Sequence, residues 1–190
     1  MQTERQVQII EESIELIANK GIQGFTIKNL SKVIGFSEPA IYRHFNSKTE
    51  ILLTILENFK EMGEMMTVLV VNNNDTTIKK IEFMFSKMLE VFTEQPAYIS
   101  VIFSEEIFKN EEILKNKIVE ILNIHQENIE KIVEIGQSNN EVRTDIDKSS
   151  LALIFMGALR LLVKRWELNN QNFNLKKEGE KLINSFSLMI

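Results

Sequence analysis

The stretch GFTIKNLSKVIGFSEPAIYRHFNSKTEIL at residues 24–52 decides the fold. Thr26 precedes apolar residues at helical spacing, among them Leu30 and Ile34, so it is predicted to cap a two-turn helix. Gly35 is predicted to end that helix in the left-handed conformation. A further helix pattern follows at once. Two short helices joined by a glycine turn are the outline of a helix-turn-helix.

The second helix of this motif is predicted within FSEPAIYRHF, residues 36–45. Proline is tolerated in a first helical turn, where its missing N–H would be unpaired anyway, so Pro39 favours a sharp start. On a helical wheel, Ile41 and Phe45 share one side and are predicted to face the core. The opposite side carries Pro39, Tyr42, Arg43 and Asn46.

Hydrogen-bonding and flat side chains on an outward face suit DNA. Arg43 can make a bidentate contact to guanine, and Tyr42 can contact a phosphate or a thymine methyl group. Each residue also has a plainer interpretation: Tyr42 and Arg43 as an amphipathic surface, and His44 as a half-buried neighbour of the core. Glu38 can favour the helix dipole or accept from a cytosine amine, and we prefer the dipole.

The segment NSKTEILLTIL that follows carries a capping box before the apolar run at residues 51–53. Ser47 is predicted to cap the Glu50 amide, while the Glu50 carboxylate reaches back. Lys48 then projects from a helix N-terminus, where a phosphate would be favoured. A lysine at such a position is more commonly solvated and binds no phosphate.

The linked motifs of residues 21–52 resemble the TetR (tetracycline-repressor) family of bacterial transcription regulators. The shared features are the glycine after the first helix, the Phe-Thr-Ile entry, the Gly-Phe-Ser turn, the Tyr-Arg-His-Phe recognition helix and the Ser-Lys-x-Glu-Ile start of the next helix. Several motifs at fixed spacing make this signal specific. Outside these residues the resemblance is one of architecture.

The resemblance implies DNA-contacting roles for eight residues. Phosphate contacts are implied for Thr26, Tyr42, His44 and Lys48. Positions facing the bases are implied for Glu38, Pro39, Ala40 and Arg43. Glu38 departs from the small, amide or basic residues frequent at its position.

An all-α fold of about nine helices is predicted, because helical periodicity runs throughout and polar or glycine breaks separate the segments. Val7, Ile10, Ile14 and Ile17 form one stripe of the first helix, which is expected to end near Lys20 and Gly21. We assign residues 1–47 to a helix-turn-helix DNA-binding domain. Residues 48–190 are assigned to a ligand-sensing and dimerisation domain, as the family pattern implies.

Candidate ligand-binding residues lie on apolar stripes rich in methionine and phenylalanine, whose soft side chains make adaptable cavity walls. They are Phe59, Met62, Met66, Phe85, Met88, Phe103 and His125, with Phe108 further along. Helical spacing of apolar residues is also what core packing alone requires. His125 is accordingly read first as a hydrogen-bonded interior residue and second as a polar anchor for a ligand.

The last two helices are candidates for a homodimer interface, as the family implies. The helix containing Leu151–Trp166 is apolar nearly all round, with Gly157 and Ala158 allowing close approach, and Leu175–Ile190 carries further apolar residues. A symmetric dimer would place two recognition helices on successive major-groove turns of a double-stranded DNA operator.

Composition excludes several other classes. The 190 residues contain no cysteine, and the net charge of −5 falls entirely after residue 50, so the N-terminal quarter is the least acidic part. The acidic pairs Glu105-Glu106 and Glu111-Glu112 lack the Glu-x-x-His spacing of a di-iron bundle, and no nucleotide-binding or hydrolase motif occurs. We expect no catalytic, metal or cofactor site. The longest apolar run, Leu151 to Val163, is too short for a membrane span, and a soluble cytoplasmic protein is expected.

The sequence therefore predicts a transcriptional regulator, by family habit a repressor, that binds a palindromic operator as a dimer. A small apolar or amphipathic effector would release it. The alternative is a DNA-bound protein of the same fold that organises the nucleoid or serves as an interaction platform.

Overall fold

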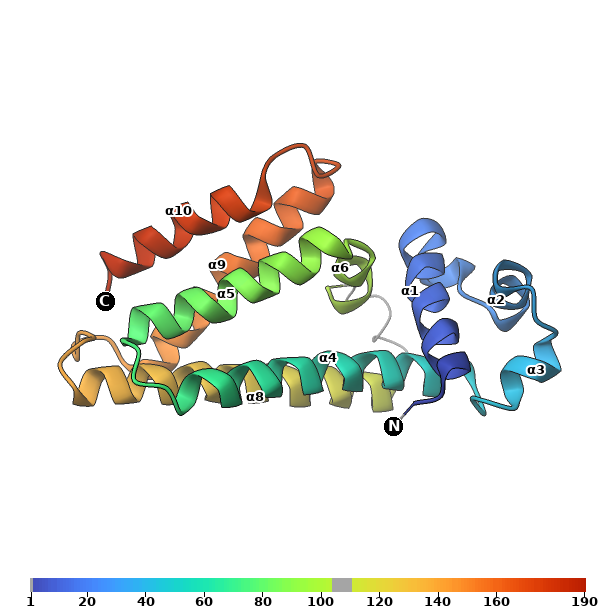
Figure 1. The fold of residues 1–190 in the computed structure, drawn as a ribbon, viewed down its shortest axis with the longest axis horizontal. Coiled ribbons are helices and arrows are strands. Elements are labelled where there is room, and N and C mark those ends of the chain that lie inside the picture. Colours follow the sequence, from blue (N-terminus) through green and yellow to red (C-terminus); the bar gives the residue numbers. More distant parts are fainter. Residues whose placement is uncertain (1, 104–110) are drawn as a thin grey trace. The chain divides into compact units, whose positions relative to one another are not determined.

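The computed structural model describes residues 2–103 and 111–190, and within these ranges the regular structure is entirely helical (Figure 1). The helices are α1 (Glu4–Gly24), α2 (Ile27–Ile34), α3 (Glu38–Tyr42), α4 (Lys48–Val71), α5 (Thr77–Glu94), α6 (Ala97–Ile102), α8 (Glu112–Ser138), α9 (Lys148–Leu168) and α10 (Leu175–Ser187). The predicted all-α class is confirmed. In the part of the chain that the structure describes, none of these helices is long and apolar enough to cross a membrane.

The chain forms two compact units. The first comprises Met1–Glu61 with Ala97–Val119, and the second comprises Met62–Pro96 with Glu120–Ile190. Helices α4 and α8 each contribute residues to both units. The first unit thus contains α6 and the beginning of α8 in addition to the helix-turn-helix.

Side-chain caps fix several helix starts. Thr3 and Gln6 form a capping box at α1, and the Asn29 amide donates to the Thr26 hydroxyl oxygen at 3.1 Å at α2. Caps of the same kind begin α9 and α10, where Asp147 accepts from the Ser150 amide and Asn174 from the Lys177 amide, both at 2.9 Å. Each cap pairs a backbone donor that the helix itself leaves unsatisfied.

Two glycines with positive φ shape the first unit. Gly35, with φ of 79°, ends α2 as predicted, and its amide donates to the Ser31 carbonyl oxygen at 3.0 Å. Gly21, with φ of 65°, breaks helical geometry inside α1. The expected end near Lys20 is therefore a kink, because a further helical turn follows it as far as Gly24.

The core of the first unit includes Ile41 and Phe45, the two side chains that the helical wheel predicts to face inward. Phe25, Leu30, Ile41 and Phe45 are almost wholly buried. Each such side chain contributes about 1.5–3 kcal/mol on burial. Val7, the first residue of the predicted apolar stripe, lies in the first turn of α1 and is 40% exposed, whereas Ile10, Ile14 and Ile17 are buried.

Polar links join α4 to the beginning of α8 within the first unit. The Thr49 hydroxyl donates to the Glu111 carboxylate at 2.7 Å. Glu57 pairs with Lys117 and, at 3.1 Å, with Lys60. The hydrogen bond from Lys117, assisted by that from Lys60, holds the pKa of Glu57 below its usual value despite partial burial. The start of α8 is thereby tied to the helix that follows the recognition motif.

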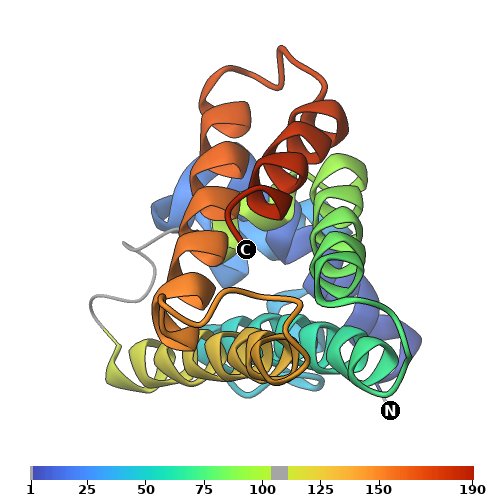
Figure 2. The ribbon, with the colours of Figure 1, turned by 90° about the vertical axis from the view of Figure 1, so that its left-hand side faces the viewer.

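The core of the second unit centres on three aromatic rings. Phe186 of α10 lies 5.7 Å from Phe85 of α5, edge to face, and 4.5 Å from Phe155 of α9, measured between ring centroids. Helix α10 packs against both α5 and α9, and Figure 2 shows it between them. Leu151, Ile129 and Val133 belong to the same cluster.

Helix α9 buries one side and exposes apolar residues on the other. The buried residues are Leu151, Ala152, Phe155, Val163 and Trp166. Leu153, Leu161 and Leu168 are 64%, 62% and 70% exposed. Helix α10 ends at Ser187, short of the predicted Ile190, and most of its exposed side chains are polar.

Candidate nucleic-acid interface

Helix α3 is short, begins at Glu38 and carries a proline in its first turn. Ser37 is its N-cap residue, Pro39 lies in the first turn, and the Ala40 amide donates to the Ser37 carbonyl oxygen at 2.9 Å. Regular helix ends at Tyr42, although the His44 and Phe45 amides still donate to the Ile41 carbonyl oxygen. The segment is thus a fixed turn of helix with a defined outward side.

The outward side carries the residues predicted to read DNA. Glu38, Pro39 and Arg43 are exposed, and Tyr42 is 49% exposed. Ala40 and His44 are half-buried beside Ile41 and Phe45, which face the core. The predicted division of faces agrees with the burial, and the contacts to DNA remain predictions.

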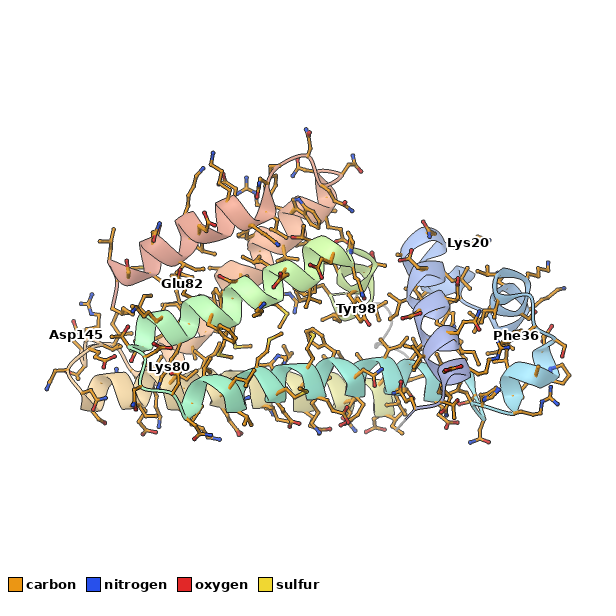
Figure 3. The ribbon with its side chains drawn as sticks, in the orientation of Figure 1. Lys20, Phe36, Lys80, Glu82, Tyr98 and Asp145 are labelled. Atoms are coloured by element: carbon orange, nitrogen blue, oxygen red, sulfur yellow. The ribbon has the colours of Figure 1, made fainter. Side chains whose placement is uncertain are left out.

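Neighbouring elements hold α3 in place. The guanidinium carbon of Arg5 lies 4.9 Å from the centroid of the Phe36 ring, in the turn between α2 and α3, where Figure 3 labels Phe36. The Gln6 side-chain amide donates to the His44 carbonyl oxygen at 3.4 Å. Helix α1 therefore contacts both ends of the recognition segment. Sequence reasoning missed Arg5 and Gln6, because nothing in their local pattern marks a partner so far along the chain.

Thr26 and Lys48, predicted to contact phosphates, lie at helix starts. Thr26 is exposed, and its hydroxyl accepts from Asn29 while retaining a proton to donate. Lys48 is half-buried: its ammonium group lies 5.3 Å from the Phe25 ring centroid and 3.5 Å from the Ile22 carbonyl oxygen. The sequence pattern did not reveal these two contacts.

The capping box before α4 takes a shifted form. The Glu50 amide donates to the Ser47 hydroxyl oxygen at 3.1 Å, as predicted. The Glu50 carboxylate accepts from the Asn46 amide at 2.6 Å, which is one residue before the cap. The loop between α3 and α4 is thus closed from both sides, and this closure fixes the point from which Lys48 extends.

The candidate ligand residues fall in both units. Phe59, which is buried, and Phe103, which is half-buried, belong to the first. The second holds Met62, Met66, Phe85, Met88 and His125. Phe85 is a core residue packed on Phe186, and the three methionines are half-buried. Their ligand roles remain predictions, and Phe108 lies outside the described residues.

His125 of α8 lies against α4 within the second unit. Its Nε2 atom would be 2.4 Å from a Cβ atom placed on Gly63. Burial lowers the pKa of His125, and the nearby Glu64 carboxylate opposes that shift. The imidazole is therefore favoured in its neutral form at pH 7. Sequence reasoning placed His125 on an interior stripe but did not identify Gly63 as its neighbour.

The acidic pairs contribute no metal cluster within residues 2–103 and 111–190, where no group of three or more His, Asp or Glu side chains is placed to hold an ion. Glu111 instead accepts a hydrogen bond from Thr49. Glu105-Glu106 lies outside the described residues.

Two family models match the chain. Residues 9–55 match the model of bacterial regulatory proteins of the tetR family, and residues 75–190 match the C-terminal region of MAATS-type transcriptional repressors. The first match contains α2 and α3, together with the predicted recognition residues.

Individual relatives match the chain over most of its length. A fatty acid metabolism regulator protein of Bacillus subtilis is 24% identical over 172 residues, covering 89% of this chain and 87% of the relative. A nucleoid occlusion factor, SlmA, of Glaesserella parasuis is 25% identical over 94% of this chain and 88% of its own.

Among solved structures, the regulator FadR of Bacillus subtilis in complex with stearoyl-CoA has a TM-score of 0.81 at 22% identity. The alignment covers 94% of this chain and 95% of FadR. A fatty acid degradation regulator from Bacillus halodurans reaches 0.87 at 16% identity, covering 98% and 96%. Because the two family models account for most of the chain, it belongs to the TetR family and is a DNA-binding transcriptional repressor.

Proposed function

We propose that this repressor binds a palindromic operator as a homodimer through α3 and is released by a long-chain acyl-CoA. The observation that supports DNA reading most directly is the two-sided α3 segment. Ile41 and Phe45 anchor it in the core, while Tyr42 and Arg43 stand exposed on the other side. A rigidly anchored helix can enter the major groove without reorganising.

The side chains around α3 fall into two groups, one that contacts the bases of the operator and one that contacts its phosphates. Arg43 suits bidentate contact with guanine, while Pro39 and Ala40 allow close approach to the bases. Thr26, Tyr42, His44 and Lys48 position the protein on the phosphates. The Glu38 carboxylate repels phosphates and base acceptors. Its position in the first turn of α3 therefore favours operators in which it faces a cytosine amine, or in which no hydrogen-bond acceptor lies opposite it.

The exposed apolar stripe on α9 supports the dimer. Leu153, Gly157, Leu161 and Leu168 fall within one narrow sector of the helix. A Cβ atom placed on Gly157 meets nothing within 4 Å in the protomer, so this side of the helix is open. Exposure of such an apolar stripe to water is unfavourable. Its burial against a second copy of the chain would stabilise a dimer. Two-fold symmetry would place the recognition helices one helical turn of DNA apart, roughly 34 Å.

The class of effector is proposed from the relatives together with the wall chemistry. The similar proteins include a fatty acid metabolism regulator and a regulator solved with stearoyl-CoA. In this chain, half-buried Met62 and Met66 of α4 and Met88 of α5 offer adaptable apolar surface to an acyl chain. The ligand acts by preferring the conformation that does not bind DNA.

A two-stage experiment tests this function. Selection from a random duplex library should enrich one palindrome, and stearoyl-CoA should then release the protein from it. Coenzyme A without its acyl chain is the matched control and should have no effect. Enrichment of a palindrome with no release by stearoyl-CoA would contradict the effector class alone. Failure to enrich any sequence would contradict operator reading.

A chromosome-organising role is the second candidate, because the SlmA relative spans most of this chain. Genome-wide occupancy distinguishes the two functions. A repressor is expected at one or a few promoters, whereas a chromosome-organising protein is expected at many dispersed sites.

A further inference from the structure

Helix α3 is anchored in the core toward its C-terminal end. Ile41 and Phe45 are almost wholly buried there. Ser37, Glu38 and Pro39, at the other end, are exposed. Ser37 makes no side-chain cap, and a helix of five residues is not stable by itself. Contacts from other elements therefore set the direction of the N-terminal end, whose residues in a recognition helix contact the base edges.

The aromatic side chain next to that end is Phe36, which is half-buried in the turn between α2 and α3 and is labelled in Figure 3. The guanidinium carbon of Arg5, on α1, lies 4.9 Å from the centroid of its ring, within the range of a cation–π interaction. Arg5 Nη1 also donates to the Gln8 side-chain oxygen at 2.9 Å. The guanidinium group is thus held by Gln8 while it covers the Phe36 ring.

The turn of α1 that carries Arg5 is itself fixed. The Gln6 backbone amide donates to the Thr3 hydroxyl oxygen at 3.3 Å, and the Thr3 amide donates to the Gln6 side-chain oxygen at 3.0 Å. The Gln6 side-chain amide makes a longer bond, of 3.4 Å, to the His44 carbonyl oxygen beyond the end of α3. All of these residues belong to the first compact unit. A capped first turn of α1 therefore meets the recognition segment near both of its ends.

We propose that Arg5 is a positioning residue for operator recognition. Its guanidinium group holds the Phe36 ring and thereby fixes the N-terminal end of α3 in the direction in which Glu38 and Pro39 face the bases. Arg5 lies outside the set of residues to which the TetR resemblance gives DNA contacts. It acts through the ring and not through a phosphate. The inference rests on the proposed reading of DNA by α3, and it names a residue outside α3 on which that reading depends.

Hydrogen exchange of the free protein tests the contact without DNA. The Ala40 and Ile41 amides both donate to the Ser37 carbonyl oxygen, at 2.9 and 3.3 Å. Arg5→Gln should raise their exchange rates by roughly 2- to 5-fold, the factor that corresponds to the loss of one exposed cation–π interaction. Arg5→Lys should retain most of the protection, because an ammonium group can also lie over the ring. The Leu30 amide, within α2, is the internal control. Unchanged exchange at Ala40 and Ile41 in Arg5→Gln would overturn the proposal.

Titrations against the selected operator and a scrambled duplex at several salt concentrations give the second readout. Arg5→Gln should weaken operator binding by roughly 2- to 5-fold per half-site, with the salt slope and the affinity for the scrambled duplex unchanged. Lys79→Ala on α5 is the matched loss of charge and should bind both duplexes as the wild type does. An equal loss on both duplexes with a lower salt slope would show that Arg5 contacts a phosphate. That result, or an unchanged operator affinity, would overturn the proposal.

A double variant tests whether Arg5 acts through the ring. Phe36→Leu removes the ring but keeps an apolar side chain. At matched folded fraction, Arg5→Gln/Phe36→Leu should bind the operator as Phe36→Leu alone does, because the ring that Arg5 contacts is already lost. Additive losses would show that Arg5 acts independently of Phe36 and would contradict the positioning role. If the wild type selects no operator, the proposed function fails separately, and the exchange experiment still decides whether Arg5 holds the start of α3.

Discussion

The Lys48 ammonium group lies 5.3 Å from the centroid of the Phe25 ring and 3.5 Å from the Ile22 carbonyl oxygen. The side chain at the start of α4 is thus held against the end of α1 and the entry to α2. An ammonium group has three donors, so these contacts leave capacity for a phosphate. This arrangement orients Lys48 before DNA binds. Lys48 is therefore predicted to contact a phosphate, whereas Arg43 is predicted to contact a base.

Lys48→Ala should weaken binding to the operator and to unrelated DNA by similar factors. A phosphate contact carries no sequence information, and its loss should lower the salt slope by about one per subunit. Titrations at several salt concentrations measure both effects. Lys79→Ala on α5 removes the same charge elsewhere and should leave the slope unchanged. A loss confined to the operator would show that Lys48 reads sequence.

Gly157→Asp should convert the dimer to a monomer and weaken operator binding. Space is open around Gly157 in the protomer, so the protomer fold should persist, while a charge amid exposed leucines opposes association. Ala158 is less suitable because it packs against the core. Sedimentation at micromolar concentration gives the mass, and Asn123→Asp on α8 serves as control. A monomeric wild type, or a dimeric variant, would contradict the proposed interface.

The half-buried imidazole of His125 predicts a specific pH dependence of stability. Its pKa is lowered from 6.5 by burial, so the unfolded state binds more protons below that value. The free energy of unfolding should therefore fall as pH decreases from about 7 to 5, by at most about 1.4 kcal/mol per pH unit. Chemical denaturation of wild type and His125→Gln measures this. Parallel slopes for the two proteins would argue against the lowered pKa.

Glu141→Gln should destabilise the protein at neutral pH. The Glu141 carboxylate accepts from the Thr77 amide at 2.7 Å and the Thr77 hydroxyl at 2.9 Å, and these bonds lower its pKa. The stabilisation is present above the usual value of 4.5 and lost as pH falls through the lowered pKa. Denaturation at a series of pH values from 7 to 3 should show a difference that shrinks as the pH falls below 4.5. Glu82→Gln, on the exposed side of α5, should show little difference at any of these pH values.

The helix-turn-helix could be predicted because its determinants are local. Thr26, Gly35 and Pro39 act on backbone within a few residues, and periodicity places Ile41 and Phe45 in the core. The contacts between distant segments could not be predicted in this way. Glu141 caps a helix that begins 64 residues earlier, and the Gly63–His125 contact depends on how α4 and α8 approach each other. The periodicity of a helix indicates which of its faces is buried. It does not show which residue of a second helix each buried residue will contact.

The central claim is that the outward side of α3 reads bases, and Arg43→Ala tests it most directly. The variant and the wild type are titrated against the selected operator and a scrambled duplex at several salt concentrations. We expect a loss of roughly 1–3 kcal/mol per half-site on the operator, little loss on the scrambled duplex, and relaxed preference at one base pair. Equal loss of affinity for both duplexes would show that Arg43 contacts only phosphate and would contradict the account.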